Sequence, residues 1–186
     1  LSIFQAKDVL SSLVVKPDSV QVNPQQNTAI SGELTMPVVK NLILTTEYAV
    51  SALTSDIRAP KYADSSHTNW LVKLTGNRTS TNLYKALKSG LNYTIGSSLI
   101  GVGYERIDPG YQTLGAYYFN NDLENITANF AQSLFKGKIN VAGNVGWQRD
   151  DLDKSKTGGS RRNVMAFNLN YNPSPRFTTN IMYSNF

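Results

Sequence analysis

Hydrophobic and polar residues alternate along the run Lys138–Asp150, KINVAGNVGWQRD. The odd positions hold Ile139, Val141, Gly143, Val145 and Trp147, and the even positions hold Asn140, Ala142, Asn144, Gly146 and Gln148. Because successive side chains of a β-strand point to opposite faces, this run predicts a strand with one apolar face and one small, polar face. Whether lipid or a second protein layer covers the apolar face decides the fold class.

Eight runs of this kind follow one another in four pairs, and each pair is joined by a short link. The pairs are Thr28–Met36 with Asn41–Ala52, Leu83–Ile95 with Leu99–Arg106, Glu124–Leu134 with Lys138–Arg149, and Asn163–Tyr171 with Arg176–Ser184. The links Pro37–Lys40, Gly96–Ser98, Phe135–Gly137 and Asn172–Pro175 each contain Gly or Pro, which favour tight turns. We therefore expect four antiparallel hairpins, with Leu1–Asp8 as a further strand.

The connections between the pairs are long and polar: Leu53–Asn82, Ile107–Leu123 and Asp150–Arg162. Short and long links alternate strictly, as in outer-membrane barrels with short periplasmic turns and long extracellular loops. The chain 1–186 is therefore predicted to be all-β, a single segment of an antiparallel up-and-down transmembrane β-barrel with roughly eight to nine strands and its long loops on one side. The alternative is a soluble antiparallel β-sandwich that acts as a binding module.

The expected strand number also concerns closure of the barrel. Single-chain bacterial barrels have an even number of strands, which places both termini on the side of the short turns. Nine strands would end the chain on the side of the long loops, so the pattern predicts a fragment of a larger barrel.

The barrel hypothesis assigns a facing to each alternating position. The predicted lipid-facing residues are Ile126, Phe130, Val141, Val145, Phe167, Leu169 and Ile181. Trp147, Tyr171 and Tyr183 are predicted at the membrane–water interface, where amphipathic rings are favoured. The predicted lumen-facing residues are Asn129, Asn140, Asn144, Gln148, Asn168 and Asn180.

Composition narrows the possible chemistry. The chain has a hydrophobic content of 40%, a mean hydropathy of -0.30 and no apolar run near the roughly 18 residues that a spanning helix needs. Without cysteine, neither a thiol nucleophile nor a cysteine metal site can form, and His67 alone offers little for a catalytic triad. The net charge of +5 is scattered rather than clustered. We therefore expect no enzyme, no cofactor, no metal and no nucleic-acid partner.

Two loops carry candidate binding residues. Tyr111, Tyr117, Tyr118 and Phe119 could form a platform for a ligand or partner, part of an interface girdle, or a loop folded into the barrel mouth. Asp150, Asp151 and Asp153 could hold a hard cation, but neighbouring Lys and Arg residues favour a solvated loop of mixed charge. Glu47, Lys85 and Arg149 are candidate lumenal charges, and Arg149 could instead mark the membrane border.

Two longer stretches carry a resemblance to a known group of proteins. Gly101–Asn125, GVGYERIDPGYQTLGAYYFNNDLEN, continues into QSLFKGKINVAGNVGWQRDDL, and the N-terminal part contains PQQNTAISGELTM and TEYAVSALTSDIRAP. These segments resemble uncharacterised outer-membrane β-barrel proteins of the Bacteroidota. The resemblance implies a bacterial outer-membrane location and a structural, pore or transport- and secretion-associated role. It implies the lipid bilayer as partner, with other outer-membrane or secretion and assembly proteins as further partners, and no catalytic residues.

Overall fold

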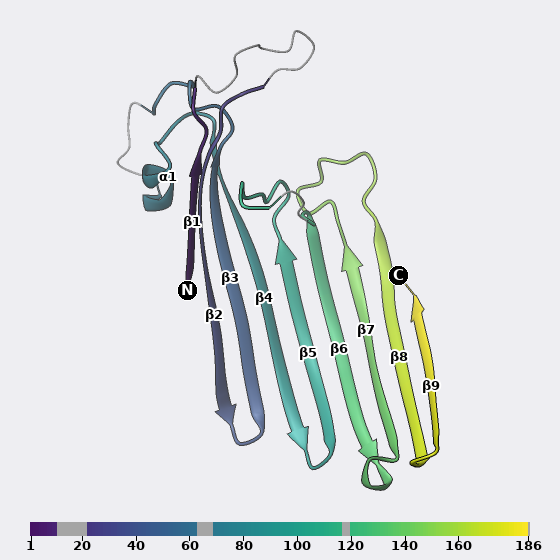
Figure 1. The fold of residues 1–186 in the computed structure, drawn as a ribbon. Helices are drawn as coiled ribbons and strands as arrows, with labels where there is room; N and C mark the ends of the chain where they lie inside the picture. Colours follow the sequence, from purple (N-terminus) through teal and green to yellow (C-terminus); the bar gives the residue numbers. More distant parts are fainter. Residues whose placement is uncertain (11–21, 63–68, 117–119, 186) are drawn as a thin grey trace. The chain divides into compact units, whose positions relative to one another are not determined.

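The computed structural model describes residues 1–10, 22–62, 69–116 and 120–185 (Figure 1). Among these residues the chain forms nine strands, one short α-helix and one 3-10 turn. The elements are β1 (Ser2–Lys7), β2 (Gln26–Val39), β3 (Leu42–Thr54), α1 (Trp70–Leu74), β4 (Thr81–Ile95), β5 (Ser98–Ile107), β6 (Leu123–Leu134), η1 (Phe135–Gly137), β7 (Ile139–Arg149), β8 (Arg161–Ser174) and β9 (Phe177–Asn185).

The strands form one sheet in the order β1-β2-β3-β4-β5-β6-β7-β8-β9. Each strand therefore lies beside its neighbours in the sequence, which confirms the predicted all-β, antiparallel, up-and-down arrangement. Strands β1 and β9 are the two edges of the described sheet, so these nine strands do not close into a barrel. The alternating short and long connections are also present, with tight turns after β2, β4, β6 and β8.

Two of the predicted links are shorter than expected because strands continue through proline. Strand β2 extends through Pro37 to Val39, and the turn is reduced to Lys40 and Asn41, with Asn41 at φ 66°. Strand β8 continues to Ser174, with a register shift between Tyr171 and Ser174 around Pro173. Because proline has no N–H to donate to a neighbouring strand, it is tolerated in a sheet where the pairing is irregular, as it is around Pro173.

The helix α1 was not predicted, because it lies in the connection Leu53–Asn82, which we expected to be a polar loop. Asn69 accepts a hydrogen bond from the Leu71 amide at 2.9 Å and so caps the first turn. The helix buries Leu71 and Val72, but five residues are too few for a helical periodicity to be visible. No helix among the described residues is long and apolar enough to cross a membrane.

The chain divides into two compact units, and β2, β3 and β4 run through both of them. Unit 1 comprises Leu1–Gly32, Tyr48–Ala86 and Gly110–Asn121, and unit 2 comprises Glu33–Glu47, Leu87–Pro109 and Asp122–Phe186. Unit 1 has a small hydrophobic core, formed by Ala52, Leu53, Ile57, Leu71, Val72 and Tyr111.

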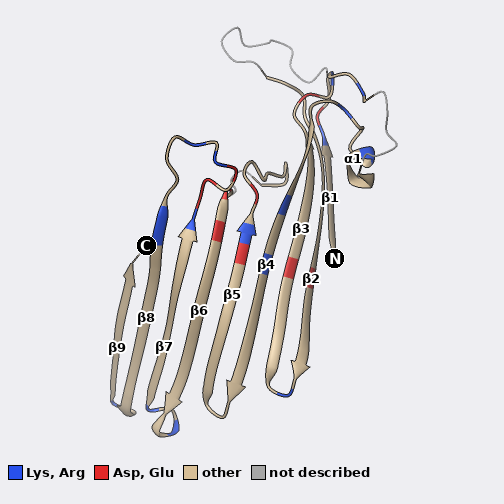
Figure 2. Cartoon of the chain, turned by 180° about the vertical axis from the view of Figure 1, so that it is seen from behind, with Lys and Arg blue, Asp and Glu red and all other residues tan. Residues whose placement is uncertain are grey.

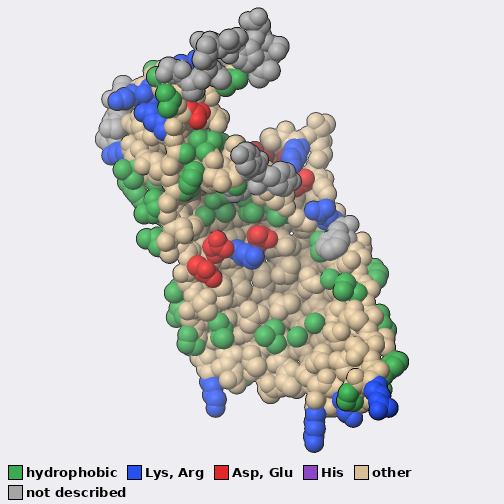
Figure 3. Space-filling model, viewed as in Figure 1, with side chains coloured by type: hydrophobic (Ala, Val, Ile, Leu, Met, Phe, Trp, Pro, Cys, Tyr) green, Lys and Arg blue, Asp and Glu red, His purple; other side chains and the backbone are tan. Residues whose placement is uncertain are grey.

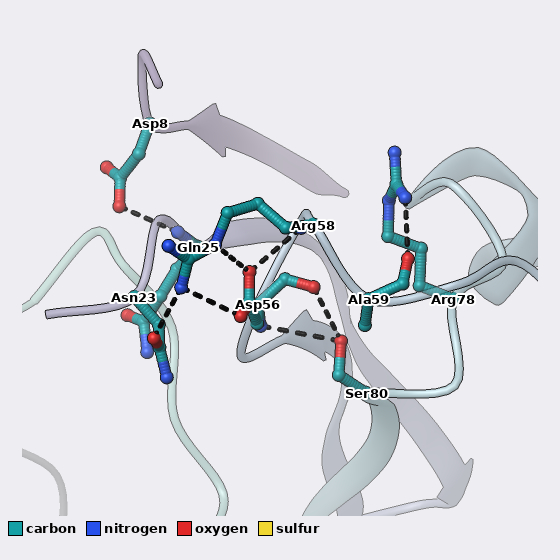
Figure 4. Close-up of polar contacts among 8 residues, drawn as sticks. All are labelled: Asp8, Asn23, Gln25, Asp56, Arg58, Ala59, Arg78 and Ser80. Atoms are coloured by element: carbon teal, nitrogen blue, oxygen red, sulfur yellow. Dashed lines mark hydrogen bonds and ion pairs between the residues drawn. The ribbon is translucent and has the colours of Figure 1, made fainter. Parts of the chain in front are cut away.

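A polar network holds the loops of unit 1 together (Figure 4). The Arg58 side chain donates to both carboxylate oxygens of Asp56 at 2.9 Å and to Asn23 Oδ1 at 2.6 Å. The hydrogen bonds from the Arg58 side chain and amide lower the pKa of Asp56 below its ordinary value. Ser80 Oγ donates to the Asp56 carbonyl at 2.8 Å, so the segment that follows β3 is tied to the start of β4.

Candidate functional site: the two faces of unit 2

The register of β5–β9 arranges side chains in rows that cross the sheet. The middle row of the apolar face joins Ile100, Phe130, Gly143, Phe167 and Tyr183. The next row towards the loops joins Val102, Ala128, Val145, Met165 and Asn185, and the next row towards the turns joins Ser98, Gln132, Val141, Leu169 and Ile181. All seven residues predicted to face lipid therefore lie on one face of the sheet, together with few polar side chains.

This apolar face has no second layer among the described residues of unit 2. Phe130 is 45% exposed and Ile181 53% exposed, while Val141, Phe167 and Leu169 are half-buried by their neighbours in the sheet. Leu123, at the loop end of β6, is the one buried hydrophobic residue in the described part of this unit. The packing of this face is therefore lateral, between side chains of adjacent strands.

Gly143 illustrates the close lateral packing. A Cβ atom at this position would lie 2.7 Å from the Phe130 ring and 3.3 Å from the Ala166 carbonyl oxygen. The ring of Phe130 therefore covers the glycine of the neighbouring strand, an arrangement that fills the face without a side chain at position 143.

Charged residues gather near the loop ends of β5, β6, β7 and β8 (Figure 2). The row Arg106, Glu124, Arg149 and Arg161 crosses the four adjacent strands β5, β6, β7 and β8. Between this row and the turns, β6 and β7 carry no charged residue, and β9 carries none along its length. Tyr104, Ile126 and Trp147 form the row directly below, where Trp147 is 60% exposed. At the opposite end, Lys136 and Lys138 stand at the turn after β6.

The three aromatic residues predicted at the interface take different places. Trp147 lies beside the charged row at the loop end. Tyr171 lies at the turn end, where its ring packs edge-on against Phe177 with the centroids 6.4 Å apart. Tyr183 instead pairs with Phe167 in the middle of the face, because β9 ends level with Met165 on β8. The expected border position of Tyr183 therefore does not match the register.

The opposite face of unit 2 carries the six residues predicted to face the lumen. Asn129 pairs with Asn144, Asn140 pairs with Asn170, and Gln148 pairs with Arg162. Several of these side chains bond to each other: Asn170 Nδ2 donates to Asn168 Oδ1 at 2.8 Å, and Asn180 Nδ2 donates to Asn170 Oδ1 at 2.7 Å. These amide side chains therefore supply hydrogen-bond partners to one another across β8 and β9.

A hollow of about 530 Å³ lies on the polar face of unit 2, between side chains of β2 to β6. Its charged lining residues are Glu33, Glu47, Lys88 and Glu105, and Thr45, Asn92, Asn125, Thr127 and Asn129 are among the uncharged ones. Figure 3 shows acidic and basic side chains gathered on a surface that is otherwise mostly uncharged. The hollow therefore presents three carboxylates, one ammonium group and a ring of amides and hydroxyls.

Of the three candidate lumenal charges, Glu47 lines the hollow, while Arg149 pairs with Glu124 at the loop end of the apolar side, as in the alternative considered for it. The lysine of β4 that lines the hollow is Lys88 rather than Lys85, and Glu33 joins from β2. The alternation in SGELTM could have indicated Glu33, but the pairing of one hairpin with the next cannot be read from a single sequence.

Asp122 organises the loop that carries Asp150, Asp151 and Asp153. Its carboxylate accepts the Asp151 amide at 3.0 Å and the Leu152 amide at 2.8 Å, and it forms an ion pair with Lys156. Burial alone would raise the pKa of Asp122, but the Lys156 ammonium and the two amides lower it below its ordinary value. The acidic loop is thus internally bonded, in agreement with the mixed-charge interpretation.

The aromatic loop after β5 belongs to unit 1 from Gly110 to Asn121. Tyr111 is only 8% exposed, so its ring is packed inside the unit and is not part of a surface platform. Tyr117, Tyr118 and Phe119 lie outside the described residues. Two buried side chains hold this loop in unit 1: Asn27 Oδ1 accepts the Leu114 amide at 3.1 Å, and Ser51 Oγ donates to the Gln112 carbonyl at 2.6 Å.

The sequence matches no model of a protein family, and neither a curated protein nor a solved structure shows significant similarity to the chain.

Proposed function

We propose that this chain forms part of the wall of a β-barrel in a bacterial outer membrane, where its role is structural or pore-forming rather than catalytic. In this proposal the apolar face of unit 2 contacts lipid and the polar face lines an aqueous interior. The observation that carries it is the continuous apolar face of unit 2, which no second layer covers among the described residues and which a charged row bounds at the loops. Outer-membrane barrels combine such a face with a polar interior.

The lengths of the strands support the proposal. Strand β7 has 11 residues and β6 has 12, and a tilted strand needs about 9–11 residues to cross a bilayer. A soluble β-sandwich would need a second apolar layer on the same face, and the described residues of unit 2 supply none. The open edges at β1 and β9 would require further strands to complete a barrel.

The composition of the polar face favours a water-filled interior rather than a packed, dry core. Its amides, hydroxyls and small residues present hydrogen-bonding groups to the hollow, which also holds Glu33, Glu47, Lys88 and Glu105. Unpaired charges in a dry core are costly, whereas charged groups facing an aqueous lumen stay solvated. We therefore infer a pore or transport-associated role in preference to a solid anchor.

Trp147 provides a direct test of the proposal. The chain has two tryptophans, so a Trp70→Phe variant in phosphatidylcholine vesicles reports on Trp147 alone. We expect strong fluorescence quenching by lipids brominated close to the headgroup and weaker quenching by lipids brominated near the end of the acyl chain, because Trp147 lies beside the charged row.

The matched control is Trp147→Phe, which leaves only Trp70 on the exposed surface of α1 in unit 1. Brominated lipids should quench this variant little. Equal quenching of both tryptophans, or a Trp147 signal quenched by aqueous iodide and by no lipid, would contradict the membrane assignment.

A further inference from the structure

The charged row of unit 2 differs from an ordinary surface cluster in its register. Arg106 pairs with Glu124, Glu124 with Arg149, and Arg149 with Arg161, so four charged residues stand at one height on adjacent strands. The row lies on the apolar side, because Arg149 is two residues from Trp147 along β7. Three guanidinium groups and one carboxylate thus stand directly beside the apolar face.

Glu124 fixes two of the three arginines. Its side chain is 13% exposed and accepts a hydrogen bond from the Tyr104 hydroxyl at 2.9 Å, with Arg149 Nε on its second oxygen. Arg106 Nη1 lies 3.7 Å from the first oxygen, and Asp108 is 3.8 Å from Arg106 Nε. The carboxylate therefore orients Arg106 and Arg149 while their side chains remain 43% and 51% exposed.

Arg161 adds a positive charge that the row does not balance. It pairs directly with Arg149, and like charges directly opposite each other destabilise a sheet. Among the described residues, no carboxylate forms an ion pair with Arg161. An anion between Arg149 and Arg161 would remove the repulsion, and the planar guanidinium fork matches the geometry of a phosphate group.

The position of the charged row along the strands, just beyond the apolar face, indicates the source of such an anion. Trp147 and Tyr104 lie one row closer to the apolar face, at the level that interfacial aromatics occupy in a membrane. The next level outward is that of the lipid headgroups. We propose that Arg149, which Glu124 orients, and Arg161 beside it bind the phosphate group of an anionic membrane lipid. This inference rests on the proposed membrane function and adds a lipid preference to it.

A matched pair of variants tests the inference, because Arg161 and its neighbour Arg162 lie on opposite faces of β8. Arg162 Nε donates to Gln148 Oε1 at 2.6 Å on the polar side. The full chain is placed in phosphatidylcholine vesicles, and electron spin resonance measures its association with spin-labelled phosphatidylglycerol relative to spin-labelled phosphatidylcholine. Arg161→Gln should lower the preference for phosphatidylglycerol about fivefold, and Arg162→Gln less than about twofold, although both remove one charge.

Each outcome of this experiment supports or overturns the inference. Equal losses in the two variants would show attraction by net charge alone and would overturn the site. If 10 mM inorganic phosphate displaces phosphatidylglycerol completely at constant ionic strength, the row is a site for free phosphate and the lipid assignment fails. If the chain does not insert into vesicles, as followed by Trp147, the proposed function fails first. Normal insertion without a phosphatidylglycerol preference contradicts the inference alone.

Discussion

Replacement of Ala128 by arginine is expected to lower the free energy of unfolding of the chain in a bilayer by about 2–4 kcal/mol. Ala128 is exposed on the apolar face, beside Val102 and Val145 and close to the middle row. Since alanine contributes little packing, the substitution mainly places a charge where the proposal has hydrocarbon. Urea titration of the chain in phosphatidylcholine vesicles, followed by tryptophan fluorescence, measures the difference.

Ala142 on β7 offers a matched control. It is also an exposed alanine, but it faces the polar side in the row with Ala131 and Asn168. Ala142→Arg should change the same free energy by less than about 0.5 kcal/mol, because the guanidinium group would remain in water. Equal destabilisation by the two arginines, or none by either, would be incompatible with one face in lipid and one in water.

Replacement of Asn27 by alanine is expected to destabilise unit 1 by roughly 2–4 kcal/mol. Asn27 is fully buried; its Nδ2 donates to Ser51 Oγ at 2.8 Å and to the Ala52 carbonyl at 2.9 Å, and its Oδ1 accepts the Leu114 amide. Truncation would leave the Leu114 amide and the Ala52 carbonyl without these partners in a buried environment. Hydrogen exchange at Leu114 should accelerate together with chymotryptic cleavage of the loop.

The control for Asn27 is Asn82→Ala, at an exposed position of β4 in the same unit. We expect it to change the free energy of unfolding by less than about 0.5 kcal/mol and to leave exchange at Leu114 unchanged. If Asn27→Ala behaved like Asn82→Ala, the loop after β5 would be held by contacts other than the Asn27 side chain.

The sequence predicted the strands because their alternation is local. Ile126 and Asn129 lie at positions of opposite parity within one strand, so their opposite faces follow from the period of two without any knowledge of neighbours. The short turn links then fix which strands form hairpins, and all nine strands formed close to the expected ranges. The open edges of the sheet are consistent both with the predicted fragment of a larger barrel and with the alternative β-sandwich.

Features that depend on distant contacts could not be predicted in the same way. The hollow combines Glu33, Glu47, Lys88 and Glu105 from four strands, and their common height depends on register between hairpins. The hydrogen bond between the Asn27 side chain and the Leu114 amide spans 87 residues, and nothing in the local pattern around either residue indicates the other. The charged row likewise depends on register, because a long loop separates Arg149 from Arg161 in the sequence and only the pairing of β7 with β8 places them opposite each other.

The most direct test of the central claim compares the surroundings of the two faces of β7. The chain has no cysteine, so single variants Ala142→Cys and Val145→Cys can each carry one nitroxide label in phosphatidylcholine vesicles. Collisions with oxygen, which concentrates in lipid, and with a water-soluble nickel chelate are then measured by power saturation. We predict a high oxygen and low nickel accessibility at position 145, and the reverse at position 142. Low accessibility to both reagents at position 145 would instead place Val145 in a protein core and contradict the membrane assignment.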